Sequence, residues 1–321
     1  MTRPNTPKRF PFPDYPTGWY RVAAATDLSA QELTTLGFFG RELVAFRSDA
    51  GSFHVLDAHC PHLGAHLGVG GCIRDGNVVC PFHGWSFDPA GNNVDIPYRP
   101  EINRKATIRT YPAQEWCGLV LVWFDEAGNP PSWQPPEVPE VHDDELIRHT
   151  PAEAHWRIRS HPQEILENAV DIVHFQFVHG VTSFGTLSSV EDGPMLRSTA
   201  ELKLNSPRGT VSGAVVNDLW GLGIDINRVI GIGKATVILT VTPIDGDSVD
   251  LNYTFLSPRA SDGNGISTFG RGHVKDSILQ LQADFPIWEN KVHRASPSLA
   301  IGEGPILSFR RWASQFYATA L

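Results

Sequence analysis

Short apolar runs separated by turn residues fill the first third of the chain. GWYRVAAA, RELVAFRS, FHVLD, GNVVCPF and GLVLVWF all fall between about Trp19 and Phe124 and are bounded by Gly, Asp, Asn or Pro. Strand-like runs between turn signals are typical of a small antiparallel β domain. The most apolar run, 116–124, is too short to cross a bilayer and is interpreted as a buried strand.

The pattern changes after a proline-rich segment, 129–141, which contains five prolines. A helical periodicity follows at 163–177, then strand-like runs such as TAELKLN, GTVSGAVV, KATVILTVTPI and DLNYTFL, then a long helical stretch at about 268–291. Strands flanked by separate helices predict an α+β domain with a large antiparallel sheet covered by helices. We therefore expect a first domain at 17–128, a linker at 129–141 and a second domain at 142–321.

Composition narrows the class of protein. The chain has 321 residues, 41% of them hydrophobic, and a formal net charge of −9, which provides no basic surface for nucleic acid or an anionic membrane. The first 20 residues carry charges and five prolines rather than the apolar core of a signal peptide. We expect a soluble, cytoplasmic protein without a membrane span, whose four cysteines do not form a disulfide framework.

Two Cys-His pairs, Cys60-Pro-His62 and Cys80-Pro-Phe-His83, are separated by a glycine-rich span. Structural zinc usually takes paired cysteines followed by paired histidines, whereas here each loop offers one of each. That interleaving favours a two-iron cluster in which cysteines hold one iron and histidines the other. A zinc site, or unrelated core cysteines and surface histidines, are the alternatives.

This stretch resembles a Rieske [2Fe–2S] domain over essentially the whole N-terminal half. Rieske proteins of respiratory complexes carry two further cysteines in the cluster loops, at positions occupied here by Ala65 and Phe82. The chain is therefore more similar to the oxygenase-type and ferredoxin-type Rieske domains.

A second set of polar residues lies in HPQEILENAVDIVHFQFVHG, residues 161–180. Asn168, Asp171 and His174 recur every three residues, near one face of a helix, and His179 follows five later. Both imidazoles can reach one metal only if the helix ends or distorts between them, and Gly180 is a plausible stop. Two histidines and a carboxylate form the site of non-haem Fe(II) oxygenases, although a buried histidine of the protein core is the alternative for either residue alone.

The third ligand must come from elsewhere in the chain. Asp284 shares an apolar helical face with Leu281 and Trp288, where an acid is costly unless it is paired or bound to a metal. Periodicity leaves three rivals open: Asp276, Glu289 and Glu303.

The two motifs together resemble the α subunit of a Rieske non-haem iron oxygenase. The C-terminal stretch beginning QADFPIWENK is similar to 3-ketosteroid 9α-hydroxylase oxygenase components, and the cluster region resembles cholesterol 7-desaturases. The resemblance implies a helix-grip-like catalytic domain. It implies that the cluster ligands are Cys60, His62, Cys80 and His83, and that the iron ligands are His174, His179 and Asp284. It also implies a head-to-tail homotrimer in which Asp171 bridges a cluster histidine and His174, with Asn168 close by.

The resemblance also implies which cofactors and partners the protein uses. The segment GIGKAT, 231–236, lacks the spacing of a phosphate loop, and no G-x-G-x-x-G opens a helix. We therefore expect NAD(P)H to act indirectly, through a flavin/iron–sulfur reductase or a ferredoxin. The reduced oxygen species formed from O2 on the iron would then attack a C–H bond of the substrate.

The substrate is expected to be small, hydrophobic and polycyclic, similar to a steroid or sterol. Candidate lining residues, with ordinary core packing as the alternative, are Phe175, Phe177, Phe184, Trp220, Leu222 and Ile224. Hydroxylation, desaturation and oxidative cyclisation share this iron chemistry. The alternative functions are oxidation of a non-steroid natural product or aromatic compound, and electron transfer by a protein whose iron site is vestigial.

Overall fold

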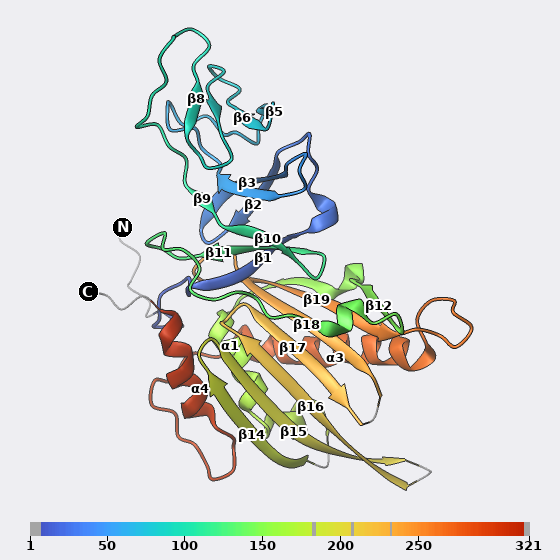
Figure 1. Ribbon diagram of the computed structural model, residues 1–321. Helices are drawn as coiled ribbons and strands as arrows, with labels where there is room; N and C mark the ends of the chain where they lie inside the picture. The colour runs from blue at the N-terminus through green and yellow to red at the C-terminus, as the bar shows by residue number, and fades with distance from the viewer. Residues whose placement is uncertain (1–7, 182–183, 207–208, 232, 318–321) are drawn as a thin grey trace. The chain divides into compact units, whose positions relative to one another are not determined.

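The computed structural model describes residues 8–181, 184–206, 209–231 and 233–317, and it separates into two compact units (Figure 1). One unit is Thr17–Pro135, and the other combines the N-terminal residues through Pro16 with the chain from Pro136 onward. The division falls between two consecutive prolines, which are poorly suited to central strands and helix interiors.

The unit Thr17–Pro135 contains three small antiparallel sheets. The first has the order β1 (Gly18–Ala24), β11 (Leu119–Phe124) and β10 (Ala113–Trp116), with the 3-10 turn η1 (Ala25–Asp27) after β1. The second consists of β2 (Thr34–Phe38), β3 (Arg41–Arg47), β4 (Phe53–Asp57) and β9 (Thr110–Tyr111). Every residue of β11 is buried, which confirms the interpretation of the apolar run as a buried strand.

The third sheet of this unit carries the segment between the two Cys-His pairs. It has the order β5 (Cys72–Arg74), β6 (Asn77–Val79), β7 (Ser86–Phe87) and β8 (Asn93–Asp95). Because β6 ends one residue before Cys80 and β7 begins just after the second pair, this sheet fixes both ends of the second loop.

The second unit is built on an eight-stranded antiparallel sheet. Its strands, in chain order, are β12 (Leu146–His149), β13 (His155–Ile158), β14 (Phe184–Asp192), β15 (Met195–Ser206), β16 (Gly209–Trp220), β17 (Ile224–Ile230), β18 (Ala235–Pro243) and β19 (Val249–Pro258). From β14 to β19 each strand pairs with the next in sequence, and both β12 and β13 pair with β19.

Helices cover one face of this sheet (Figure 1). The helical segments are η2 (Pro139–His142), η3 (Ala152–Ala154), α1 (Pro162–Leu166), η4 (Glu167–Val170), α2 (His174–Phe177), α3 (Thr268–Trp288), α4 (Ile306–Ala313) and η5 (Ser314–Phe316). Apolar residues of α1, α3 and α4 pack on inward-facing sheet residues such as Leu219, Leu239 and Leu251. These layers confirm the predicted fold class of an antiparallel β domain followed by an α+β domain.

The long helix α3 places a narrow stripe of side chains against the sheet. Ser267 caps its first turn by accepting a hydrogen bond from the N–H of Gly270. Ile278, Leu281, Asp284 and Trp288 are buried at helical spacing, so the one acid of the stripe faces the interior as its periodicity predicted. None of the helices in the described ranges is long and apolar enough to cross a bilayer.

Candidate metal centres and their cavity

The two Cys-His loops of the N-terminal unit have the same backbone hydrogen bonds. The N–H of Cys60 and that of Cys80 each donate to the carbonyl five residues later, at 2.9 and 2.8 Å. The carbonyl of each cysteine accepts from a glycine N–H four residues later, at 2.9 Å for Gly64 and 3.1 Å for Gly84. Both glycines have a positive φ, +79° and +72°, which explains why glycine closes each turn.

These matching turns bring the four side chains together. Both cysteines are buried, the Cys60 and Cys80 side chains are close enough to affect each other's ionisation, and the rings of His62 and His83 lie 4.7 Å apart. Burial raises the pKa of Cys60 to about 11, and the neighbouring Cys80 adds to the increase. Nδ1 of His83 is buried without a hydrogen-bond partner among the described residues. Two buried thiols and an imidazole nitrogen in need of a partner suit a metal cluster.

Aromatic neighbours fix the orientation of the two imidazoles. Trp85 stacks on His62 with ring centroids 4.3 Å apart and planes within 7°, and its indole N–H donates to the Tyr98 hydroxyl at 2.8 Å. Phe82 packs on His83 at 3.8 Å. The other two cysteines of the chain lie outside these turns, Cys72 exposed and Cys117 half-buried.

The predicted helix over 163–177 is interrupted, so the prediction of one continuous helix is wrong. α1 ends at Leu166 and η4 follows it and ends at Val170. The next residue, Asp171, has a non-helical ψ of 93°, and α2 begins at His174. Oδ1 of Asp171 accepts hydrogen bonds from the N–H groups of Val173 and His174, at 3.2 and 3.3 Å. An aspartate that bonds the following N–H groups competes with helix continuation, and Asn168, Asp171 and His174 therefore do not share one helical face.

The break at Asp171 sets the tautomer of His174. Nδ1 of His174 donates to the backbone carbonyl of Asp171 at 2.5 Å, and a carbonyl can only accept, so Nδ1 carries the proton and Nε2 keeps its lone pair. Burial lowers the pKa of His174, which favours the neutral ring that binds metals. The expected hydrogen bond from His174 to the Asp171 carboxylate is replaced by this backbone contact, and the nearest carboxylate oxygen lies 3.9 Å from Nδ1.

A left-handed turn then brings His179 back beside His174. Gly180 has a φ of +67°, and the N–H of Val181 bonds back to the Phe175 carbonyl at 3.0 Å. α2 ends at Phe177, between the two histidines as the metal site required, but three residues before the predicted stop at Gly180. The rings of His174 and His179 lie 5.1 Å apart.

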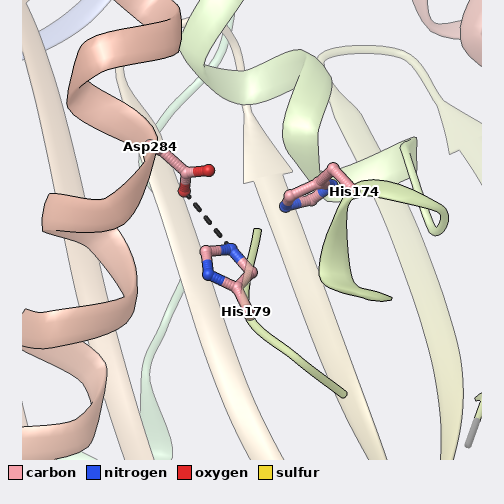
Figure 2. A group of neighbouring side chains, drawn as sticks. All are labelled: His174, His179 and Asp284. Atoms are coloured by element: carbon pink, nitrogen blue, oxygen red, sulfur yellow. Dashed lines mark ion pairs between the residues drawn. The ribbon is translucent and has the colours of Figure 1, made fainter. Parts of the chain in front are cut away.

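Asp284 completes the group from the far side (Figure 2). Its Oδ2 lies 3.5 Å from Nε2 of His179, and one donor atom from each of His174, His179 and Asp284 lies within 4.8 Å of the others. Asp284 is 5% exposed, and Nδ1 of His179 is buried with no partner in the part of the chain that the structure describes. A buried carboxylate facing two imidazoles suits a divalent metal ion.

The three rival acids are not part of this group of side chains and have other partners. Asp276 is exposed and accepts a hydrogen bond from Gln280, Glu289 accepts from the backbone of Arg159, and Glu303 accepts from the backbone of Ala300. Asn168 accepts a hydrogen bond from the Trp288 indole at 3.4 Å, one helical turn beyond Asp284. This contact ties η4 to α3, a role for Trp288 that the sequence did not reveal.

A cavity of about 550 Å³ lies beside the three side chains. Strands β16 to β19 line one side, α3 lines another, and the segments around His174 and His179 line the rest. Its apolar wall includes Ile165, Leu166, Val215, Val229, Val237, Leu239 and Leu281. Both the size and the mostly apolar wall are usual for a small-molecule site.

The predicted lining residues are only partly correct. Phe175 lines the cavity, whereas Phe177 is 79% exposed and Leu222 is fully buried in the hydrophobic core. The side chain of Phe184 lies outside the described residues. The sequence prediction missed Asn217, Asp225 and Asn227, which line the cavity from β16 and β17. The sequence signal for this wall was the alternation along β17, which places Asp225, Asn227 and Val229 on the same face of the sheet.

Asp225 is a buried carboxyl group in the cavity wall. It is 8% exposed, and its Oδ1 has no hydrogen-bond partner among the described residues. Burial raises the pKa of Asp225 from 3.8 to about 7; the negative charge of Asp218 adds to this and Arg228 opposes it.

Comparisons with known proteins agree with both halves of this structure. The Rieske [2Fe-2S] domain family matches residues 18–112, and the 3-ketosteroid 9α-hydroxylase C-terminal domain family matches residues 122–317. The chain is 31% identical over 335 residues to cholesterol 7-desaturase nvd of Drosophila melanogaster, which covers 96% of this chain and 76% of that protein. It is 27% identical over 338 residues to the probable 3-ketosteroid-9-alpha-monooxygenase, oxygenase component, of Rhodococcus rhodochrous, which covers 94% of this chain and 80% of that protein.

Solved structures share the fold. Dicamba monooxygenase bound to dicamba has a TM-score of 0.71 at 16% identity, covering 93% of this chain and 96% of that one. Pseudomonas putida CBB5 NdmB has a TM-score of 0.74 at 19% identity, covering 95% of this chain and 90% of that one.

The chain belongs to the Rieske oxygenases, in the family that carries the 3-ketosteroid 9α-hydroxylase C-terminal domain. It is a terminal oxygenase component, an oxidoreductase with a Rieske [2Fe–2S] cluster. It uses NAD(P)H indirectly, through a reductase or ferredoxin partner. These findings confirm the class, the Rieske cluster and the kind of partner that the motifs implied.

The two cluster turns provide a matched test of backbone geometry. Gly84→Ala and Gly64→Ala both place a Cβ at positive φ, but only the Cβ at position 84 meets a neighbour, Pro97, at 2.9 Å. We predict that Gly84→Ala loses substantially more cluster than Gly64→Ala, as measured by visible absorbance per chain. Equal occupancy in the two variants would contradict this account of the second loop.

Asp225 makes stability depend on pH. Between about pH 4 and 7 the Asp225 carboxyl group keeps its proton in the folded protein but loses it in the unfolded chain. The free energy of unfolding therefore falls as the pH rises through that window. Asp225→Asn has no such titration. The unfolding free energy of the variant relative to wild type should therefore rise by about 4 kcal/mol from pH 4 to pH 8. Denaturant unfolding at both pH values tests this, and a constant difference would show that Asp225 is not a buried titrating group.

Proposed function

We propose that this oxygenase oxidises a C–H bond of a hydrophobic, polycyclic, sterol-like substrate at an iron held by His174, His179 and Asp284. The observation that carries the proposal is the meeting of two imidazoles and one buried carboxylate, within 4.8 Å, at the wall of a largely apolar cavity. Two histidines and one carboxylate leave coordination positions open for O2.

The cluster ligands are proposed on the same kind of evidence. Cys60 and Cys80 would hold one iron and His62 and His83 the other, because two matching turns bring these side chains together. Neutral imidazoles in place of two thiolates raise the reduction potential of such a cluster.

Two observations support a sterol-like substrate. The relatives described above are named for cholesterol 7-desaturation and for 3-ketosteroid 9α-monooxygenation, and each alignment covers at least 94% of this chain. The cavity has apolar side chains on both the sheet and the helical side, and polar side chains such as Asn217, Asn227 and Gln280 lie among them.

The side chains around the iron site have separate tasks. When bound, the iron supplies the chemistry that reduces O2 and oxidises a C–H bond. The Asp171 carbonyl keeps the proton of His174 on Nδ1 and so directs Nε2 toward the metal position. Asp284 adds a negative charge that offsets part of the charge of a divalent ion. The apolar wall excludes bulk water from the reacting bond.

Electron delivery is proposed to pass between neighbouring subunits of a homotrimer by way of Asp171. Its carbonyl contacts His174, while its side chain remains 33% exposed, so one residue joins an iron ligand to the protein surface. Asn168 would support this path by holding η4 against Trp288. The four free cysteines favour a reducing compartment such as the cytoplasm.

Metal analysis tests the assignment of ligands. We predict three irons per wild-type chain and two in Asp284→Ala, with an unchanged cluster spectrum, because two imidazoles alone hold Fe(II) weakly. Asp276→Ala, which removes a rival acid from the same helix, should retain three. Three irons in Asp284→Ala would contradict the ligand set, and a colourless, zinc-loaded wild-type protein would contradict both metal centres.

A single-turnover assay tests the substrate class. Protein reduced anaerobically is mixed with sterols and 3-ketosteroids, then with O2, and products are analysed by mass spectrometry. We predict a product that gains one oxygen, as in hydroxylation, or loses two hydrogens, as in desaturation. Product only from smaller aromatic compounds would replace the sterol proposal with the alternative class of substrate.

A further inference from the structure

Asp225 stands in an apolar row of the cavity wall. It pairs across the sheet with Leu219 on β16 and with Leu239 on β18, both of which are buried. Directly paired residues point to the same face of a sheet, so the carboxyl group lies between leucine side chains on the cavity side. An apolar residue would be the ordinary choice at this position.

The neighbouring polar residues of the sheet already have partners. Asn227 donates to the Asn217 side chain at 2.6 Å, Asn217 donates to Ser198 at 3.4 Å, and Ser198 donates to the backbone carbonyl of Ala169 at 2.7 Å. This chain of hydrogen bonds does not include Asp225, whose Oδ1 is left without a partner in the described part of the protein.

Arg228 is the cation that acts on the Asp225 carboxyl group, but it does not neutralise it. Arg228 forms its own ion pairs with Glu140 and Asp218, and burial still raises the pKa of Asp225 to about 7. A buried carboxyl group without a full set of hydrogen bonds destabilises the fold. Such groups are concentrated at binding and catalytic sites, where a ligand supplies the missing partner.

We propose that the Asp225 carboxyl group binds a hydroxyl group of the substrate, so that the enzyme selects hydroxylated polycyclic compounds over their ketone and hydrocarbon counterparts. The proposal rests on the sterol-like substrate class proposed above. A hydroxyl group can donate to a carboxylate and can also accept from a carboxylic acid, so it satisfies Asp225 in either protonation state. A ketone can only accept, and a hydrocarbon does neither. An ammonium group would have to be desolvated among apolar side chains, which disfavours it.

The test uses three compounds with one carbon skeleton: cholesterol, cholest-5-en-3-one and cholest-5-ene. At pH 8, where Asp225 is mainly ionised, wild-type kcat/KM should favour cholesterol over the other two by about 10- to 100-fold. Asp225→Leu should remove this preference and weaken cholesterol binding by a similar factor, measured as Kd with the anaerobic holoenzyme. Asp225→Asn should narrow the gap between cholesterol and the ketone, because an amide N–H can donate to a carbonyl.

Asp262→Asn is the matched control, because it removes the charge of an exposed acid that accepts a hydrogen bond from the Asn264 N–H and is not among the residues that line the cavity. It should keep the wild-type preference ratio. Turnover by Asp225→Leu and Asp225→Asn with unchanged ratios and unchanged Kd would overturn the role of Asp225 while leaving the proposed function intact. No product from any of the three compounds with wild-type protein would overturn the sterol proposal and the hydroxyl assignment together.

Discussion

The structure of the catalytic unit depends on keeping one carboxylate, Asp284, in the protein interior opposite two imidazoles. A buried carboxylate is unfavourable unless a counter-charge and hydrogen bonds meet it, and here the available partners are His174 and His179. The position of α3 over the sheet, the break at Asp171 and the turn at Gly180 all serve this meeting. In this account a divalent ion supplies the missing charge, so folding and metal binding favour the same arrangement.

Both metal centres use the backbone to direct side chains. In the loops of the two Cys-His pairs, a glycine with positive φ closes the turn that contains the histidine. At the proposed iron site, the Asp171 carbonyl accepts the Nδ1 proton of His174 and so sets its tautomer. In the neighbouring cavity, by contrast, side chains of the sheet bond one another, as Asn227 does with Asn217. Oδ1 of Asp225 has no hydrogen-bond partner among the described residues. In the proposed account, the metal site and the Asp225 carboxyl group together orient the substrate in this cavity.

The features that the sequence could predict are local or periodic. The Cys-His pairs lie in short loops, a helix end before His179 is required by the spacing of the two histidines, and Asp284 lies on a regular apolar stripe. The continuous helix over 163–177 was wrong because periodicity does not register the Asp171 side chain competing for backbone N–H groups. Asp225 was missed because the face to which a strand residue points is known only once its partners are known. His174 donates to the backbone carbonyl of Asp171 rather than to its carboxylate, and this choice depends on the backbone conformation at Asp171, which the sequence pattern does not specify.

The central claim is that electrons stored in the Rieske cluster are used at the site formed by His174, His179 and Asp284. Stopped-flow absorbance tests this directly, with chemically reduced protein, cholesterol, O2 and no reductase. The account predicts rapid reoxidation of the cluster in step with product formation in wild-type protein, and loss of both in Asp284→Ala, although its cluster is intact. Equally rapid reoxidation with product in Asp284→Ala would contradict the account.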